Sequence, residues 1–136
     1  MGCRKQEGRS ISIMSINVQS PEGGPQSETF TGTFTATGAF NSSGNQVTVV
    51  QPLGTDSIRG NATFTAPEGT FTIVMTLEKP TTSYATSAAG HWKVARGTGA
   101  YAFLRGNGQV TMLFPPDVPR YTLSAETITG VVWLHP

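Results

Sequence analysis

The residues from Thr29 to Phe40 alternate between two kinds of side chain, and this pattern constrains the fold more than any other. Threonine occupies every odd position from Thr29 to Thr37, while the even positions hold Phe30, Gly32, Phe34, Ala36, Gly38 and Phe40. A period of two places successive side chains on opposite faces of a β-strand. A face that mixes Phe with Gly and Ala suits the inner surface of a tightly curved sheet, because the small residues make room for the large ones. The run therefore predicts a strand of a curved sheet.

Alternation of the same kind recurs along the chain, whereas no segment shows sustained helical periodicity. With the run above, the predicted strands span residues 11–18, 29–40, 47–53, 58–66, 70–79, 84–96, 109–114 and 120–134. The first strand slips in phase between Ile13 and Met14, which indicates a bulge or an end buried on both faces, and the last shifts before Ile128. About eight strands joined by short turns are typical of an up-and-down barrel or a sandwich. Long open edges invite aggregation, so the predicted fold is an all-β, closed antiparallel β-barrel.

The length and charge of the chain limit the classes of protein it can belong to. It has 136 residues, a net charge of +1 and 12% charged residues. This length fits one domain, which we place at residues 11–136, after a polar and flexible leader at residues 1–10. The sparse, balanced charge lacks the basic surface that nucleic-acid binding requires. No apolar run approaches the ~20 residues of a membrane-spanning helix. We therefore expect neither a nucleic-acid partner nor a spanning helix.

Cys3 is the only cysteine of the sequence, which excludes an internal disulfide. The pair Gly2-Cys3, followed at once by Arg4-Lys5-Gln6-Glu7, resembles the start of a mature bacterial lipoprotein whose cysteine accepts the lipid. This hypothesis makes Cys3 a lipid anchor, limits membrane contact to that lipid and favours an extracytoplasmic location. An ordinary exposed cysteine in a disordered end and a cytoplasmic location stay open as alternatives.

A glycine-rich stretch links two of the late predicted strands. Gly97-Thr98-Gly99-Ala100-Tyr101-Ala102 formally matches the dinucleotide-binding fingerprint. That fingerprint requires a following amphipathic helix whose N-terminus holds the pyrophosphate, and here a turn and a strand follow instead. The apolar segment before Arg105-Gly106-Asn107-Gly108 is too short for an ordinary helix. We therefore predict a short helical turn near residues 99–104 that closes one end of the barrel.

The stretch from Gly97 to Val110 resembles the signature of the allene oxide cyclase-like and dirigent-like barrels. In that superfamily a Gly-Thr/Ser-Gly turn, an aromatic residue, a short turn and a glycine-bearing strand follow one another, and the strand from Gly32 to Gly38 is also similar. The resemblance implies an eight-stranded antiparallel barrel with an apolar lumen, often a dimer or trimer. Allene oxide cyclases carry a Glu two positions before an Asn in the first strand. Aligning that Asn with Asn17 puts Ser15 at the Glu position, so the resemblance indicates an architecture and not a literal allene oxide cyclase.

Relatives in that superfamily from bacterial biosynthetic clusters cyclise polyketides largely through the shape of the cavity. The first hypothesis is therefore a barrel that binds a small apolar molecule in its lumen, as a cofactor-independent cyclase or isomerase if it is an enzyme. The predicted lumen residues that bind the ligand are Phe30, Phe34, Phe64, Phe71, Met75 and Trp92. The alternative is a non-enzymatic, secreted or lipid-anchored barrel that acts through protein interaction or as a homodimer or homotrimer.

Few side chains offer catalytic chemistry. Glu78 ends an apolar strand, and Tyr101 and Arg96 flank the glycine turn, where they would line a barrel mouth. These three are the catalytic candidates, and each also has a plain explanation as a solvated strand end or a brace for the turn. His91 and His135 are the only histidines of the sequence, and neither has Cys, Asp or Glu at ligand spacing. We therefore expect no metal site and no cofactor.

Overall fold

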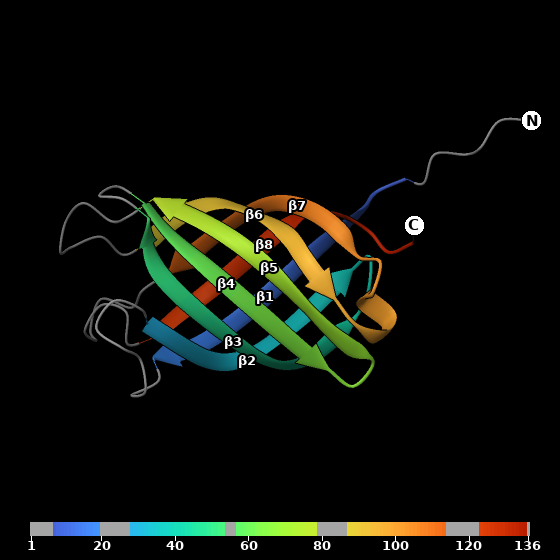
Figure 1. Cartoon of the computed structure of the whole chain (residues 1–136), viewed down its shortest axis with the longest axis horizontal. Coiled ribbons are helices and arrows are strands. Elements are labelled where there is room, and N and C mark those ends of the chain that lie inside the picture. The colour runs from blue at the N-terminus through green and yellow to red at the C-terminus, as the bar shows by residue number, and fades with distance from the viewer. Residues whose placement is uncertain (1–6, 20–27, 54–56, 79–86, 114–122, 136) are drawn as a thin grey trace, which may run out of the picture.

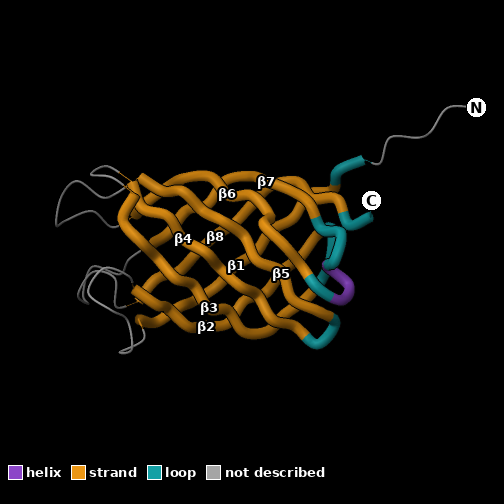
Figure 2. The backbone as a smooth tube through the Cα atoms, viewed as in Figure 1, coloured by secondary structure: helices purple, strands orange, loops and turns teal. Residues whose placement is uncertain are grey.

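The structure is a computed structural model, which describes residues 7–19, 28–53, 57–78, 87–113 and 123–135. Eight antiparallel strands form a closed barrel, in which each strand pairs with the next and β8 returns to pair with β1 (Figures 1 and 2). The strands are β1 (Arg9–Gln19), β2 (Glu28–Gly38), β3 (Ser42–Leu53), β4 (Ser57–Ala66), β5 (Gly69–Glu78), β6 (Ser87–Gly97), β7 (Arg105–Leu113) and β8 (Leu123–Trp133). This confirms the predicted all-β, closed barrel of about eight strands. Arg9 and Ser10, assigned to the leader from the sequence, pair with Val132 and Val131 of β8.

The two ends of the barrel differ. At one end, called the plug end here, β1 begins, β8 finishes, and the single-turn 3-10 helix η1 (Gly99–Tyr101) lies beside the connections at residues 39–41 and 67–68 (Figure 1). At the other, called the far end, β1, β3, β5 and β7 finish. The predicted helical turn near residues 99–104 is confirmed as η1, between β6 and β7.

Inward-pointing side chains of the alternating strands fill the half of the interior next to the plug end, called the plug half here. The half next to the far end is called the far half. Phe34, Phe64 and Phe71 point inward and are at most 2% exposed. Their ring centroids lie 4.7–6.1 Å apart, with Phe64 stacked on Phe71 and Phe34 edge-on to both. Edge-on and stacked pairs of this kind add to the stabilisation from burial. These rings are therefore the packed centre of the fold.

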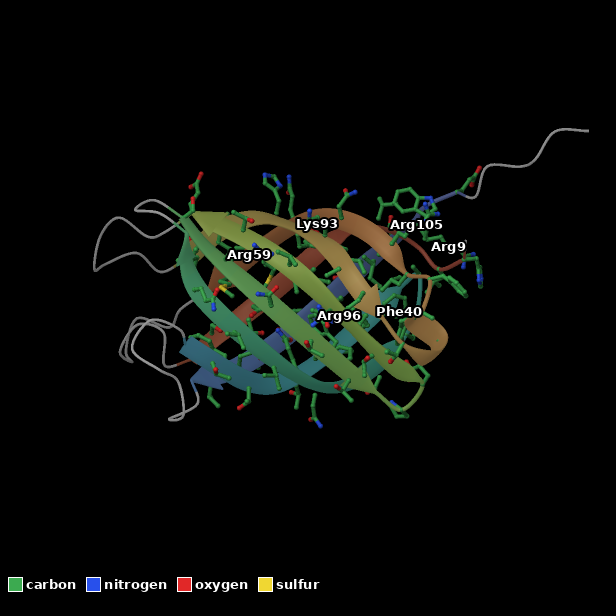
Figure 3. The ribbon with its side chains drawn as sticks, viewed as in Figure 1. Arg9, Phe40, Arg59, Lys93, Arg96 and Arg105 are labelled. Atoms are coloured by element: carbon green, nitrogen blue, oxygen red, sulfur yellow. The ribbon has the colours of Figure 1, made fainter. Side chains whose placement is uncertain are left out.

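Tyr101 of η1 closes this aromatic cluster from the plug end. Its ring centroid lies 4.9 Å from that of Phe40 and 5.0 Å from that of Phe71, and Figure 3 shows Phe40 at this end of the barrel. The Tyr101 hydroxyl donates to the Glu68 carboxylate, which also accepts from Ser42 Oγ at 2.5 Å. Gly99, at φ +59, takes the left-handed conformation that starts the turn. The glycine motif therefore builds a plug and contains no phosphate-binding helix.

The strands predicted at 47–53 and 109–114 begin earlier in the structure, each with a glycine-containing segment. The stretch 42–45 belongs to β3 and the stretch 105–108 belongs to β7. A Cβ added to Gly44 would lie 1.9 Å from the backbone oxygen of Thr65, and one added to Gly108 would lie 2.0 Å from that of Thr129. Glycine is therefore needed where the backbones of the curved sheet approach closely, and the strands continue through these glycines.

Candidate functional site

One side of the interior is polar toward the far end. Six inward-pointing polar side chains from β1, β3 and β8 are at most 5% exposed, and we call them the polar cluster: Ser15, Asn17, Gln46, Thr48, Ser124 and Glu126. The register places Ser15 opposite Glu126 and Asn17 opposite Ser124 across β1 and β8. Gln46 comes from β3, two strands away from β1, and reaches across the interior to Glu126. The closed barrel therefore gathers residues that are far apart in the sequence.

The structure has neither the bulge nor the end buried on both faces that the slip in β1 indicated, and β8 has no register shift before Ile128. Both strands keep an unbroken register with both neighbours. In β1, Ile11 and Ile13 point inward, whereas Met14 and Ile16 point outward and are 63% and 62% exposed. Toward the far end the strand therefore has apolar residues outside and polar residues inside. Alternation along a strand separates two faces but does not say which face points inward. When the apolar residues move from the inner face to the outer face, the sequence pattern therefore looks like a slip in phase.

Glu126 is the centre of the polar cluster. It is 2% exposed, and its two carboxylate oxygens accept hydrogen bonds from Gln46 Nε2 at 3.1 Å and from Asn17 Nδ2 at 3.4 Å. Burial raises the pKa of Glu126 to about 7, because the charged form loses its hydration, and the bond from Gln46 offsets part of that rise. Over the described ranges, no other charged side chain is buried. A carboxyl group of this kind is suited to giving or taking a proton near neutral pH.

Two carbonyl oxygens of the polar cluster are unpaired. Asn17 Nδ2 donates to Ser15 Oγ at 3.1 Å as well as to Glu126, and Gln46 Nε2 donates to Thr48 Oγ1 at 3.0 Å as well as to Glu126. The side-chain oxygens Oδ1 of Asn17 and Oε1 of Gln46 are buried without a hydrogen-bond partner. Leaving such an atom unpaired costs about 1–3 kcal/mol. The two oxygens are therefore free hydrogen-bond acceptors in the interior of the barrel.

Gly32 of β2 provides space for this arrangement. It pairs with Asn17 on one side and with Gln46 on the other. A Cβ on Gly32 would lie 2.6 Å from Asn17 Oδ1 and 1.9 Å from the backbone oxygen of Ile16. The glycine of the Phe-Gly-Phe alternation thus leaves room for the Asn17 amide on the inner surface.

The part of the far half that β5 and β7 line is apolar. β5 contributes Met75 and Leu77, and β7 contributes Met112, which pairs directly with Glu126. These three side chains are at most 4% exposed. β4 to β7 and the strands β8, β1, β2 and β3 each form half of the barrel circumference. The far half therefore has one polar and one apolar side.

All six predicted lumen residues are buried inside the barrel, at 0–5% exposure: Phe30, Phe34, Phe64, Phe71, Met75 and Trp92. Three of them are the packed rings of the plug half. Phe30 lies apart from the main apolar core and pairs with Thr48 of the polar cluster. Trp92 is fixed by a hydrogen bond of 3.0 Å from Nε1 to the backbone oxygen of Thr129. Their binding of a ligand stays a prediction.

The three catalytic candidates are not brought together. Glu78 is exposed near the far end, beside an outer groove of about 380 Å³ that crosses β5, β6 and β7. Arg96 is exposed on β6 at the plug end, and the labelled basic side chains in Figure 3 lie over the outer surface. Tyr101 is buried in the plug, where burial and the bond to Glu68 raise its pKa to about 12. Its hydroxyl is therefore held protonated as part of a structural contact.

Three further expectations from the sequence concern a lipid anchor, a metal site and a membrane-spanning helix. Cys3, the predicted lipid anchor, lies outside the described residues. No group of three His, Cys, Asp or Glu side chains in the described part of the chain is placed to hold a metal ion. Among the described residues there is no helix with the length and apolar character needed to cross a membrane.

Glu126, Gln46 and Ser124 were not predicted as site residues from the sequence. A signal was present, because Ser15-x-Asn17 and Ser124-x-Glu126 place polar residues two apart within strands. Such pairs share one face of a strand. Apolar alternation by itself assigns a polar face of a strand to the solvent, and these pairs therefore gave no prediction of a buried site. The chain matches no family model, no curated protein and no solved structure, and the candidate site therefore rests on the geometry of its own side chains.

Proposed function

We propose that the barrel binds a small, largely apolar molecule in the far half of its interior, with Glu126, Asn17 and Gln46 contacting the polar end of that molecule. The apolar wall of Met75, Leu77 and Met112 would contact its body. The proposal keeps the lumen ligand expected from the sequence and moves its site away from the packed rings of the plug half.

The observation that carries the proposal is a buried carboxyl group beside two unpaired carbonyl oxygens. A buried ionisable group with incomplete partners destabilises a fold, and apolar residues of similar volume would often be more stable. The plug half shows that this chain can pack such residues closely. A polar cluster kept at a cost to stability is typical of a binding or catalytic site.

Native mass spectrometry of the purified protein tests this proposal. We expect a bound small molecule that is retained by the wild type and by Glu78→Gln, since Glu78 lies on the outer surface. Glu126→Gln, which has nearly the same shape, should lose most of the bound fraction. Equal retention by both variants, or a ligand that contacts only the outer surface in an NMR titration, would contradict the proposal.

We also propose a reaction class, cofactor-independent isomerisation or cyclisation, in which Glu126 takes a proton from one substrate atom and returns it to another. Such a transfer leaves the composition of the substrate unchanged and needs one carboxyl group that can hold the proton. The resemblance to the allene oxide cyclase-like barrels supports this class. That family carries its Glu at the position of Ser15, and Glu126 lies opposite Ser15 on the neighbouring strand.

Solvent deuterium distinguishes this reaction from simple binding. The co-purified molecule, incubated with the protein in D₂O, should gain deuterium at carbon when Glu126 is present and should not when it is replaced by Gln. If the molecule binds but its deuterium exchange does not depend on Glu126, the protein binds this molecule without catalysing the reaction, and the enzyme proposal is wrong.

A second candidate function is self-association through the outer face of β1. Met14, Ile16 and Val18 are 51–63% exposed and point outward from one strand. The outward residues opposite them on β2 are the uncharged Thr31, Thr33 and Thr35. Exposed apolar side chains gathered in this way are typical of interfaces. Light scattering should show a dimer or trimer that Ile16→Glu converts to a monomer, and a monomeric wild type would exclude this candidate.

A further inference from the structure

The hydrogen bonds of the two amides in the polar cluster restrict the ligand. Each side-chain amide has two N–H groups, and those of Asn17 and Gln46 are all used: two go to Glu126, one to Ser15 and one to Thr48. The unused capacity of the two amides lies entirely on their oxygens, Asn17 Oδ1 and Gln46 Oε1. Both amides therefore offer acceptors and no free donor.

Glu126 fixes this polarity. Both of its oxygens accept a hydrogen bond from an amide, which is the arrangement of an ionised carboxylate. Rotating the amide of Asn17 or Gln46 by half a turn would direct an oxygen at that carboxylate, and two acceptors facing each other repel. With Glu126 ionised, the two amides are held with their oxygens free.

We infer that the polar end of the ligand is a hydrogen-bond donor, a hydroxyl or an ammonium group, and that ligands ending in a carboxylate or in an ether oxygen are rejected. This inference rests on the proposed function and names the chemical class of its ligand. A donor would pair with Asn17 Oδ1 or Gln46 Oε1. An acceptor could pair only with a hydroxyl of the polar cluster and would leave both amide oxygens unpaired. A carboxylate would in addition be repelled by Glu126.

The apolar wall restricts the rest of the molecule. Met75, Leu77 and Met112 offer no strong hydrogen-bonding group, so the part of the ligand that lies against them is a hydrocarbon. The plug half is filled by its aromatic rings and limits the depth of the site. The expected ligand is therefore a short amphipathic molecule with one donor group.

Four probes that share one apolar body test the inference: 2-phenylethanol, 2-phenylethylammonium, methyl 2-phenylethyl ether and 3-phenylpropanoate. Binding is measured at pH 8, where Glu126 is ionised, by calorimetry, with NMR shifts of inward-facing residues to locate the probe. We expect the alcohol and the ammonium ion to bind about 10-fold or more tightly than the ether and the carboxylate, since one hydrogen bond separates them.

Glu126→Gln separates charge from hydrogen bonding. In this variant the ammonium ion should lose about 10-fold or more in affinity, because its charge-assisted partner is gone, while the alcohol should lose less. If the variant does not fold, the order of the four probes on the wild type decides the question alone. Tighter binding of the ether or the carboxylate inside the barrel would overturn the donor inference and leave the proposed function standing. Failure of all four probes to enter the barrel would overturn both.

Discussion

The plug half and the far half of the barrel interior are built from the same alternating strands, yet their buried side chains make different kinds of contact. In the plug half, Phe34, Phe64 and Phe71 contact one another, and Tyr101 covers them from the end. In the far half, Glu126 is surrounded by amides whose oxygens stay unpaired. The aromatic side chains of the plug half contact one another, whereas two buried carbonyl oxygens of the far half have no hydrogen-bond partner. The comparison teaches that stability and the candidate function occupy separate layers of one barrel.

The largest expected effect comes from breaking the plug half. Phe64→Ala removes a ring that is 0% exposed and stacked 4.7 Å from Phe71, so it should lower the free energy of unfolding by about 3–5 kcal/mol. Urea unfolding measures this loss. Phe103→Ala is the matched control, because Phe103 is 60% exposed and its removal should change stability by at most about 0.5 kcal/mol. Similar losses in the two variants would show that the plug half is not the packed centre.

The far half should make stability depend on pH through Glu126. In the unfolded chain this carboxyl has its ordinary pKa of 4.5, and burial raises the pKa in the folded barrel to about 7. The folded state therefore holds the proton more tightly, and its contribution to stability is complete below pH 4.5 and is lost as the pH rises to about 7. The difference corresponds to about 3 kcal/mol.

Urea unfolding across pH 4 to 8 checks this dependence. The neighbours of Glu126 carry no charge. Asn17 and Gln46 donate hydrogen bonds to it, and Ser15 and Met112 lie opposite it on the two adjacent strands. Glu126→Gln should therefore remove most of the slope. Glu78→Gln, on the outer surface, should leave it in place. A slope that persists in Glu126→Gln would assign the pH dependence to another group.

A smaller effect should come from the contact that holds the plug. Tyr101→Phe keeps the ring against Phe40 and Phe71 and removes only the hydrogen bond to Glu68. We expect a loss of about 1 kcal/mol in unfolding free energy, because Glu68 is exposed to solvent. Ligand retention in the far half should not change. A loss of ligand in this variant would show that the two halves are coupled.

The smallest effect is expected on the outer face. Ile16→Thr changes a side chain that is 62% exposed, so the free energy of unfolding of the monomer should change by at most about 0.5 kcal/mol. Thermal unfolding at several protein concentrations measures it. A larger loss that grows with protein concentration would instead indicate that Ile16 is buried between copies of the chain.

The fold could be predicted because the signal is local. The alternation of Phe30, Gly32 and Phe34, repeated with other apolar residues along the chain, is sufficient to predict long curved strands, and long strands with exposed edges favour closure. Gly97 and Gly99 predicted the position of the short turn that forms the plug. The polar cluster could not be predicted in this way, because hydrophobicity alone assigns a polar residue in a strand to the solvent.

By itself, the sequence determined the strands, their number, the short turn at the plug end and the burial of Phe64, Phe71 and Met75. Only the tertiary structure decided that Asn17, Gln46 and Glu126 meet inside. The physical reason is that strand periodicity defines two faces but does not determine which of them points inward. In addition, only closure of the barrel brings a side chain of β3 within hydrogen-bonding distance of one on β8. In this barrel the inner face changes from apolar to polar along β1 and β8, and the candidate site lies where it changes.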